Sequence, residues 1–140
     1  MINVEQMHDA RIIPIFASAT EARANRRPEV LQQYMGDSVG WYEDGALVVE
    51  TINVNPQQMQ QSSTAITENG KVTERFTRYS NTEIVYRFTV EDSDLYSQAW
   101  TAELSFHASD GQLYEYACHE GNYSMPGTLA GARRLEAEQR

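Results

Sequence analysis

Three turn dipeptides divide this chain into short alternating segments and constrain its fold more than any other feature. They are Asp44-Gly45, Asn69-Gly70 and Asp110-Gly111. Asp-Gly and Asn-Gly pairs tolerate the positive φ angles of two-residue hairpins, so each predicts a turn between antiparallel strands. The segments around them alternate and are rich in β-branched and aromatic residues, which indicates strands. These segments are residues 39–43, 47–54, 72–79, 83–90, 100–107 and 113–120.

The remaining segments complete a mainly β pattern. Residues 11–16 predict another strand, which Pro14 confines to a sheet edge or a bulge. Residues 21–27 fit either a helix or a strand, and the polar stretch 56–67 is expected to be a loop long enough to cover a cavity. A helix is predicted over residues 127–139, which are rich in Ala, Leu, Arg and Glu.

We therefore expect an antiparallel barrel of eight to nine strands, lipocalin-like, with a C-terminal helix. A two-sheet sandwich is the alternative. The barrel is favoured because closure removes exposed sheet edges, and about eight strands can enclose one small ligand. The length of 140 residues suits a single β-barrel domain over residues 1–140.

Composition excludes several function classes. The formal net charge is −9, from 20 acidic and 11 basic residues, which argues against nucleic-acid binding because such proteins need a basic stripe. No run of about 18 apolar residues predicts a membrane span. The single cysteine, Cys118, forms no intrachain disulfide, which is typical of a reducing compartment. We expect a cytoplasmic protein, although a chain from which a leader had been removed would read the same.

A dense group of functional side chains lies at the end of the last predicted strand. On a regular strand, one face carries two tyrosines, a thiol and a carboxylate, and these are Tyr114, Tyr116, Cys118 and Glu120. Apolar surroundings would raise the pKa of the Glu120 carboxyl and suit it to general acid–base work. The alternative is a carboxylate that caps the following turn or pairs with an arginine.

The neighbours of Glu120 carry weaker predictions. His119 points to the opposite face unless Gly121 marks a bulge, so a surface histidine is the competing interpretation. A buried, inert thiol is favoured for Cys118 over a nucleophile, because adjacency on a strand supplies no base. Asn122 follows directly, and its amide is expected to contact a ligand.

A second carboxylate, Glu74, shares a strand face with Val72 and Phe76, whereas Thr73, Arg75 and Thr77 form the polar face. Glu74 is therefore expected to point inward and to form an acid–base pair with Glu120. Alternatively, Arg75 or Arg87 neutralises one of the two carboxylates. A strand half exposed on both sides, or a bulge that reverses the faces, is the competing interpretation.

Aromatic residues exceed what the predicted chemistry needs. Core packing explains most of them. A cavity lined by some, here Trp41, Tyr86 and Trp100, would favour a ring-bearing or otherwise apolar ligand.

No cofactor or metal is expected. The three histidines are scattered, without His-x-x-x-His or paired-cysteine spacing, and the chain has no phosphate-binding or dinucleotide motif. Gly36-Asp37-Ser38-Val39-Gly40 matches the G-x-S-x-G nucleophile elbow in letters. However, that motif needs a strand-to-helix turn. Here a glycine-rich bend entering a strand is the favoured interpretation.

Several blocks resemble a family of uncharacterised bacterial proteins. The most specific is YEYACHEGNY at residues 114–123, followed by Gly127 and by GAR at residues 131–133. Weaker blocks are residues 35–40 with 47–51, and residues 74–78 with 86–92 and 100–101. The resemblance implies a shared fold and a site at the C-terminal motif, and no particular activity.

Together these features predict a cofactor-free barrel enzyme, of lyase or isomerase type, that acts by proton transfer on a small apolar or aromatic molecule. The expected catalytic residues are Glu120, Glu74, His119 and Tyr116. The expected ligand-binding residues are Tyr114, Cys118, Asn122, Trp41, Tyr86, Trp100 and Arg87. A non-catalytic carrier or sensor of the same ligand is the alternative. A third interpretation is an accessory module whose C-terminal helix docks onto a partner or onto a second copy in a homodimer.

Overall fold

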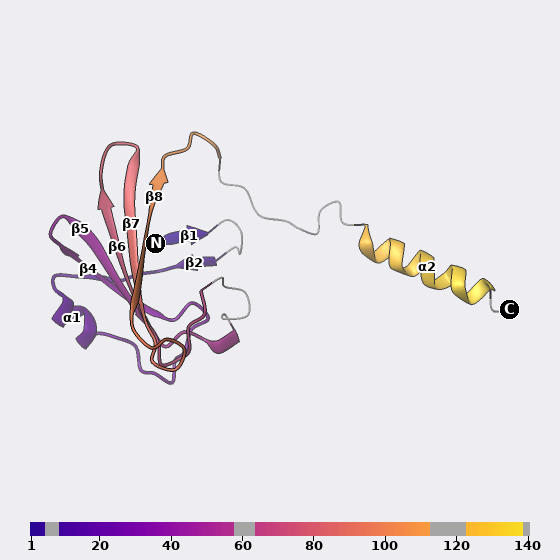
Figure 1. Ribbon diagram of the computed structural model, residues 1–140, viewed down its shortest axis with the longest axis horizontal. Coiled ribbons are helices and arrows are strands. Elements are labelled where there is room, and N and C mark those ends of the chain that lie inside the picture. Colours follow the sequence, from indigo (N-terminus) through magenta and orange to yellow (C-terminus); the bar gives the residue numbers. More distant parts are fainter. Residues whose placement is uncertain (5–8, 58–63, 113–122, 139–140) are drawn as a thin grey trace. The chain divides into compact units, whose positions relative to one another are not determined.

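A computed structural model of the chain describes residues 1–4, 9–57, 64–112 and 123–138. The elements within these ranges follow the sequence order shown in Figure 1. The strands are β1 (Ile2–Val4), β2 (Asp9–Arg11), β3 (Ile15–Phe16), β4 (Asp37–Glu43), β5 (Ala46–Ile52), β6 (Lys71–Arg78), β7 (Glu83–Glu91) and β8 (Trp100–His107). The helices are α1 (Ala19–Ala24) and α2 (Ser124–Glu138).

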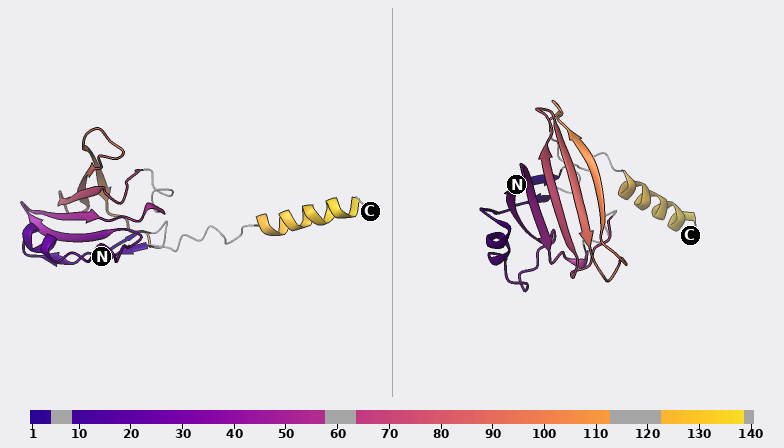
Figure 2. Two further views of the ribbon diagram at one scale, coloured as in Figure 1. Left: turned by 90° about the horizontal axis from the view of Figure 1, so that it is seen from below. Right: turned by 60° about the vertical axis from the view of Figure 1, so that its left-hand side comes forward.

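The principal sheet has six strands in the order β3-β4-β5-β6-β7-β8, and β1 pairs with β2 in a small separate sheet. From β4 to β8 every pairing is antiparallel, whereas β3 pairs with β4 in parallel. The strands lie side by side in chain order, and the right-hand view of Figure 2 shows the twist of the sheet. The mainly β prediction is confirmed, but the sheet is mixed rather than wholly antiparallel.

The sheet is open rather than closed into a barrel within the described ranges. Its two end strands, β3 and β8, do not pair with each other. The strand expected over residues 113–120 lies outside the described residues. Barrel closure and the lipocalin-like architecture are therefore not confirmed, because the element that would have to continue the sheet beyond β8 is not described.

The three turn dipeptides have different outcomes. Asp44-Gly45 joins β4 to β5 as predicted, with positive φ at both residues, 48° and 74°. Asn69-Gly70 instead lies in a loop before β6, where a Cβ on Gly70 would collide with the Ile66 side chain. Asp110-Gly111 follows β8, and what it leads into lies outside the described residues.

The N-terminal segment resolves two expectations. The strand predicted over residues 11–16 is divided, with β2 ending at Arg11 and β3 beginning at Ile15. Pro14 lies in the interruption, where its carbonyl accepts a hydrogen bond from Gly40 N at 2.9 Å. The ambiguous segment after β3 is helix α1, which begins after the N-cap Ser18, whose hydroxyl accepts from Glu21 N at 3.2 Å.

Helix α1 packs on one face of β4 and β5. The buried residues Ala22, Val39, Trp41 and Val48 form a core cluster there, with Phe16 and Ala19 packed against it. Trp41 also lies beneath the Arg23 guanidinium, which is 5.5 Å from the ring centroid. Because side chains alternate along a strand, the residues between these core positions face the other side of the sheet.

Glu50 is buried on the α1 side of the sheet and holds two arginines. Arg26 donates to it at 2.6 Å and Arg23 at 2.8 Å, and Arg26 also reaches the Asp37 carbonyl at 2.9 Å. Burial raises the pKa of the Glu50 carboxyl, but the hydrogen bonds and charges of Arg23 and Arg26 outweigh it and hold the pKa below its usual value. This network ties α1 and the segment that follows it to the sheet.

The chain forms two compact units, residues 1–3 with 10–111 and residues 4–9 with 112–140. In the second unit the described helix α2 confirms the predicted C-terminal helix and begins three residues earlier, at Ser124. Within it, Arg134 pairs with Glu138 at 3.0 Å. The single-domain prediction stays a prediction. No helix of the described residues is long and apolar enough to cross a membrane.

We expect Glu50→Gln to lower the free energy of unfolding at neutral pH by about 1.5–3 kcal/mol, because two buried hydrogen bonds to a charged carboxylate are weakened. Since the pKa of Glu50 is lowered on folding, its contribution is complete above its unfolded value of 4.5 and is lost as the pH falls below that value. Urea denaturation at pH 7 and pH 3 measures both effects. The matched control is Glu43→Gln, whose exposed pair with Arg75 should contribute at most about 1 kcal/mol. An equal loss in both variants would contradict the prediction.

Candidate functional site

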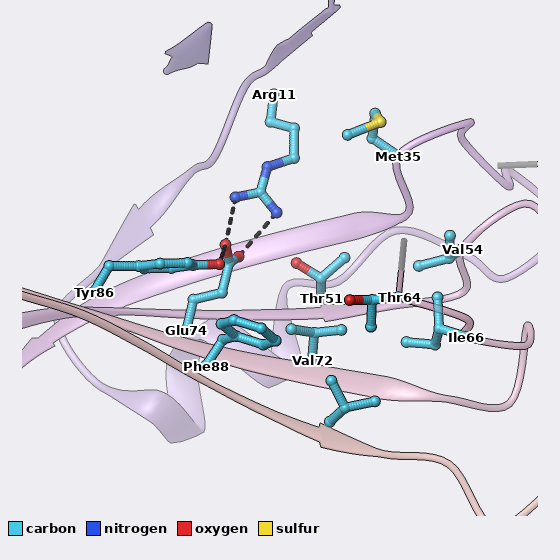
Figure 3. A pocket seen from close by; sticks show the side chains of 11 residues that line it. Arg11, Met35, Thr51, Val54, Thr64, Ile66, Val72, Glu74, Tyr86 and Phe88 are labelled. Carbon is cyan, nitrogen blue, oxygen red and sulfur yellow. Dashed lines mark hydrogen bonds and ion pairs between the residues drawn. The ribbon is translucent and has the colours of Figure 1, made fainter. Parts of the chain in front are cut away.

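A cavity of about 240 Å³ lies against the face of the sheet opposite α1. Strands β5, β6 and β7 supply its wall, and the loops around Met35, Val54 and Ile66 supply further lining (Figure 3). The full lining is Arg11, Met35, Thr51, Val54, Thr64, Ile66, Val72, Glu74, Tyr86, Phe88 and Val90. The loop expected to cover a cavity thus contributes Thr64 and Ile66, while residues 58–63 lie outside the described ranges.

Strand register explains why these residues meet. Glu74 pairs with Val49 on β5 and with Phe88 on β7, and Val72 pairs with Thr51 and Val90. Directly paired residues point to the same face. The face analysis of β6 is therefore confirmed, because Glu74 is buried with 4% of its surface exposed.

Three polar side chains gather at one end of the cavity. Arg11 donates to both oxygens of Glu74, each at 2.9 Å, in a two-pronged ion pair. Tyr86 donates its hydroxyl hydrogen to Glu74 Oε1 at 2.8 Å. Figure 3 shows Arg11, Glu74 and Tyr86 together, with Val54, Ile66 and Val72 toward the other end. The cavity thus has one polar end and an otherwise largely apolar wall.

The Tyr86 hydroxyl is held in its protonated form. Burial raises its pKa above the ordinary value of 10.0, and the negative charge and hydrogen bond of Glu74 raise it further, although Arg11 acts in the opposite direction. The ring is fixed between aromatic neighbours, with centroids 4.8 Å from Phe76, 5.5 Å from Phe88 and 5.1 Å from Phe106. Tyr86 therefore presents a rigid, neutral hydroxyl to the cavity.

The arginine that neutralises Glu74 is Arg11, not either of the residues considered from the sequence. Arg75 pairs with Glu43 at 3.3 Å, and Arg87 pairs with Glu103 at 2.7 Å. Both arginines alternate with Glu74 or its partner Phe88 and therefore face the other side of the sheet. Arg11 lies 63 residues away from Glu74, and no local pattern connects them. A single cation before the apolar run Ile12-Ile13-Pro14-Ile15 was the one available signal.

Three of the predicted ligand-binding residues lie outside this cavity. Trp41 is buried under α1 because it alternates with the cavity-facing positions of β4. Arg87 lies on the outer face in its pair with Glu103. Trp100 shares the cavity-side parity but packs edge-on against Phe88 and Tyr96, with centroids at 5.6 and 5.8 Å. Only Glu74 and Tyr86, of the predicted site residues that are described, line the cavity.

The predicted cluster of the C-terminal motif lies outside the described residues. It comprises Tyr114, Tyr116, Cys118, His119, Glu120 and Asn122. Their roles, and the Glu74–Glu120 pair, stay predictions.

The G-x-S-x-G match is a bend entering a strand, as favoured from the sequence. Gly36 has φ 78°, and β4 begins at the next residue. Ser38 is buried and shares a hydrogen bond of 2.7 Å with the Thr51 hydroxyl on β5. It is therefore a structural residue of the strand pair and not an exposed nucleophile.

We expect Glu74→Leu to destabilise the protein by about 3–5 kcal/mol, because it leaves the buried Arg11 guanidinium without a counter-charge. The double variant Arg11→Met with Glu74→Leu should recover most of that loss, since it removes both charges. Urea denaturation measures both, and Glu103→Gln on the exposed pair is the control, with a loss of at most about 1 kcal/mol. A double variant as unstable as the single one would show that the pairing is not the cause.

We also expect Tyr86 to stay protonated while ordinary tyrosines ionise. As the pH is raised through 10, the tyrosinate absorbance of Tyr86→Phe should match that of the wild type, because a raised pKa keeps Tyr86 out of that titration. Tyr79→Phe, at an exposed tyrosine, is the matched control and should lose the signal of one residue. The prediction is wrong if both variants lose the same amplitude while folded.

Comparison of the chain with protein-family models, with curated proteins and with solved structures finds no match.

Proposed function

We propose that this protein binds a small, largely apolar molecule in the cavity bounded by Glu74, Tyr86 and Phe88. The observation that supports the proposal most directly is the lining itself, which combines one charge-compensated polar group with an apolar wall. Ligand sites are typically apolar concavities with a few placed polar groups. Since an apolar cavity of about 150 Å³ accommodates benzene in another protein, a space of about 240 Å³ suits a substituted ring.

The polar end also favours a binding role over a purely structural one. Burying an ion pair costs solvation, and well-packed apolar residues in its place often stabilise a protein equally well or better. The Arg11–Glu74 pair is therefore a weak explanation of stability by itself. Its position in a cavity wall is consistent with the orientation of a bound molecule.

Binding is preferred to acid–base catalysis at Glu74 because the carboxylate is already engaged. Its oxygens accept hydrogen bonds from Arg11 and from Tyr86. A general base needs to reach the proton it removes. The preferred interpretation is accordingly a carrier or sensor in which the polar groups orient the ligand.

A lyase or isomerase remains the second candidate, supported by the burial of a carboxylate and a phenol together in the cavity wall. In that proposal Glu120 is the acid–base residue, with His119 and Tyr116 polarising the substrate. Glu120→Gln and Glu74→Gln would then each lower turnover of an identified substrate. Full turnover in both variants would exclude it.

The barrel expected from the sequence belongs to the same proposal. Pairing of residues 113–120 with β8 would extend the wall beyond Phe106 and bring the sheet nearer to closure. The resemblance to the bacterial family carrying the YEYACHEGNY motif is likewise retained as a proposal.

We expect Val72→Phe to weaken the binding of ethylbenzene at least about tenfold, because the larger ring occupies the cavity. Isothermal titration calorimetry measures the affinity. Val85→Phe is the matched control, since Val85 lies on the neighbouring strand β7 but alternates with the cavity-lining Tyr86. Unchanged affinity in a folded Val72→Phe protein would refute binding at this cavity.

A further inference from the structure

The hydrogen-bonding capacity left at the polar end of the cavity defines what a ligand can offer there. A carboxylate accepts about four hydrogen bonds. Among the described residues, Glu74 accepts two at Oε1, from Arg11 and Tyr86, and one at Oε2, from Arg11. Oε2 therefore retains an acceptor position. The Tyr86 oxygen, which uses its hydrogen on Glu74, is a second acceptor.

Donors remain on the same group. A guanidinium carries five N–H bonds, and within the described part of the chain Arg11 directs two of them at Glu74. Arg11 lines the cavity. A ligand group placed beside the pair therefore meets both an acceptor and a donor.

The charge at this end is balanced. Arg11 and Glu74 carry opposite unit charges, and the side chains are 14% and 6% exposed. The other lining residues carry no charge. An ionic ligand would be attracted by one partner and repelled by the other, and it would lose its hydration without gaining a counter-ion. Charge balance therefore selects against anions and cations alike.

From these observations, and resting on the proposed function, we propose that the ligand is a neutral molecule with an apolar body and one hydroxyl group. The hydroxyl donates to the Glu74–Tyr86 pair and accepts an N–H from Arg11. The body lies against Val72, Phe88 and Ile66. A hydroxyl is the simplest neutral group that both donates and accepts.

Calorimetric titration of the full chain with five probes of similar size tests this inference. The probes are benzyl alcohol, its apolar isostere ethylbenzene, the acceptor-only benzyl methyl ether, the anion benzoate and the cation benzylammonium. Apolar transfer alone would favour ethylbenzene. We expect instead that benzyl alcohol binds at least about tenfold more tightly than ethylbenzene and than either ion, because hydrogen bonds to charged groups are strong when buried. The ether should fall between the alcohol and ethylbenzene.

The outcomes separate this inference from the proposed function. Ethylbenzene that binds as tightly as the alcohol would overturn the hydroxyl preference and leave apolar binding intact. Tighter binding of benzoate or benzylammonium would overturn the neutral-ligand inference. Failure of all five probes to bind would overturn the proposed function and this inference with it.

Reciprocal variants give a readout that a merely structural ion pair would not change. Glu74→Gln leaves Arg11 positive and should shift the preference toward benzoate. Arg11→Met leaves Glu74 negative and should shift the preference toward benzylammonium. Glu103→Gln, on the exposed outer pair with Arg87, is the matched control and should preserve the wild-type order. Folded variants that keep the wild-type order would overturn the inference, and the wild-type series alone decides it if either variant does not fold.

Discussion

The ion pair between Arg11 and Glu74 is the interaction on which the rest of the candidate site depends. Glu74 occupies the middle of β6 and pairs with residues on both neighbouring strands, so its carboxylate cannot leave the cavity face. A charge buried in this way requires a partner. The partner comes from the end of β2, a strand outside the principal sheet. The pair therefore connects the N-terminal segment to the sheet and sets the polar end of the cavity.

A second buried carboxylate follows the same rule on the other face. Glu50 projects toward α1 and is neutralised by Arg23 and Arg26, which come from α1 and the segment after it. In both cases a sheet carboxylate meets an arginine from the N-terminal part of the chain. The two pairs differ in what surrounds them. Glu50 belongs to a packed network under a helix, whereas Glu74 borders open space. Only the latter leaves room for a ligand.

Particular residues show how far local patterns predicted the site. Alternation along β6 placed Glu74 inward, and the structure confirms this because strand parity is a local property. The same parity explains why Trp41 and Arg87 do not line the cavity, since they alternate with positions that do. Arg11 could not be found, because its pairing spans 63 residues and depends on the division of the N-terminal segment around Pro14. The choice between Arg75, Arg87 and Arg11 was a question of three-dimensional contact.

The sequence by itself determined the strands, the Asp44-Gly45 hairpin, the C-terminal helix and the inward direction of Glu74. Each of these follows from propensity, turn chemistry or two-residue alternation over a few neighbouring residues. Only the tertiary structure decided that β3 joins the sheet in parallel, that α1 covers one face, and that Arg11 neutralises Glu74 beside a cavity. These outcomes depend on contacts between segments far apart in the chain, which local pattern does not specify.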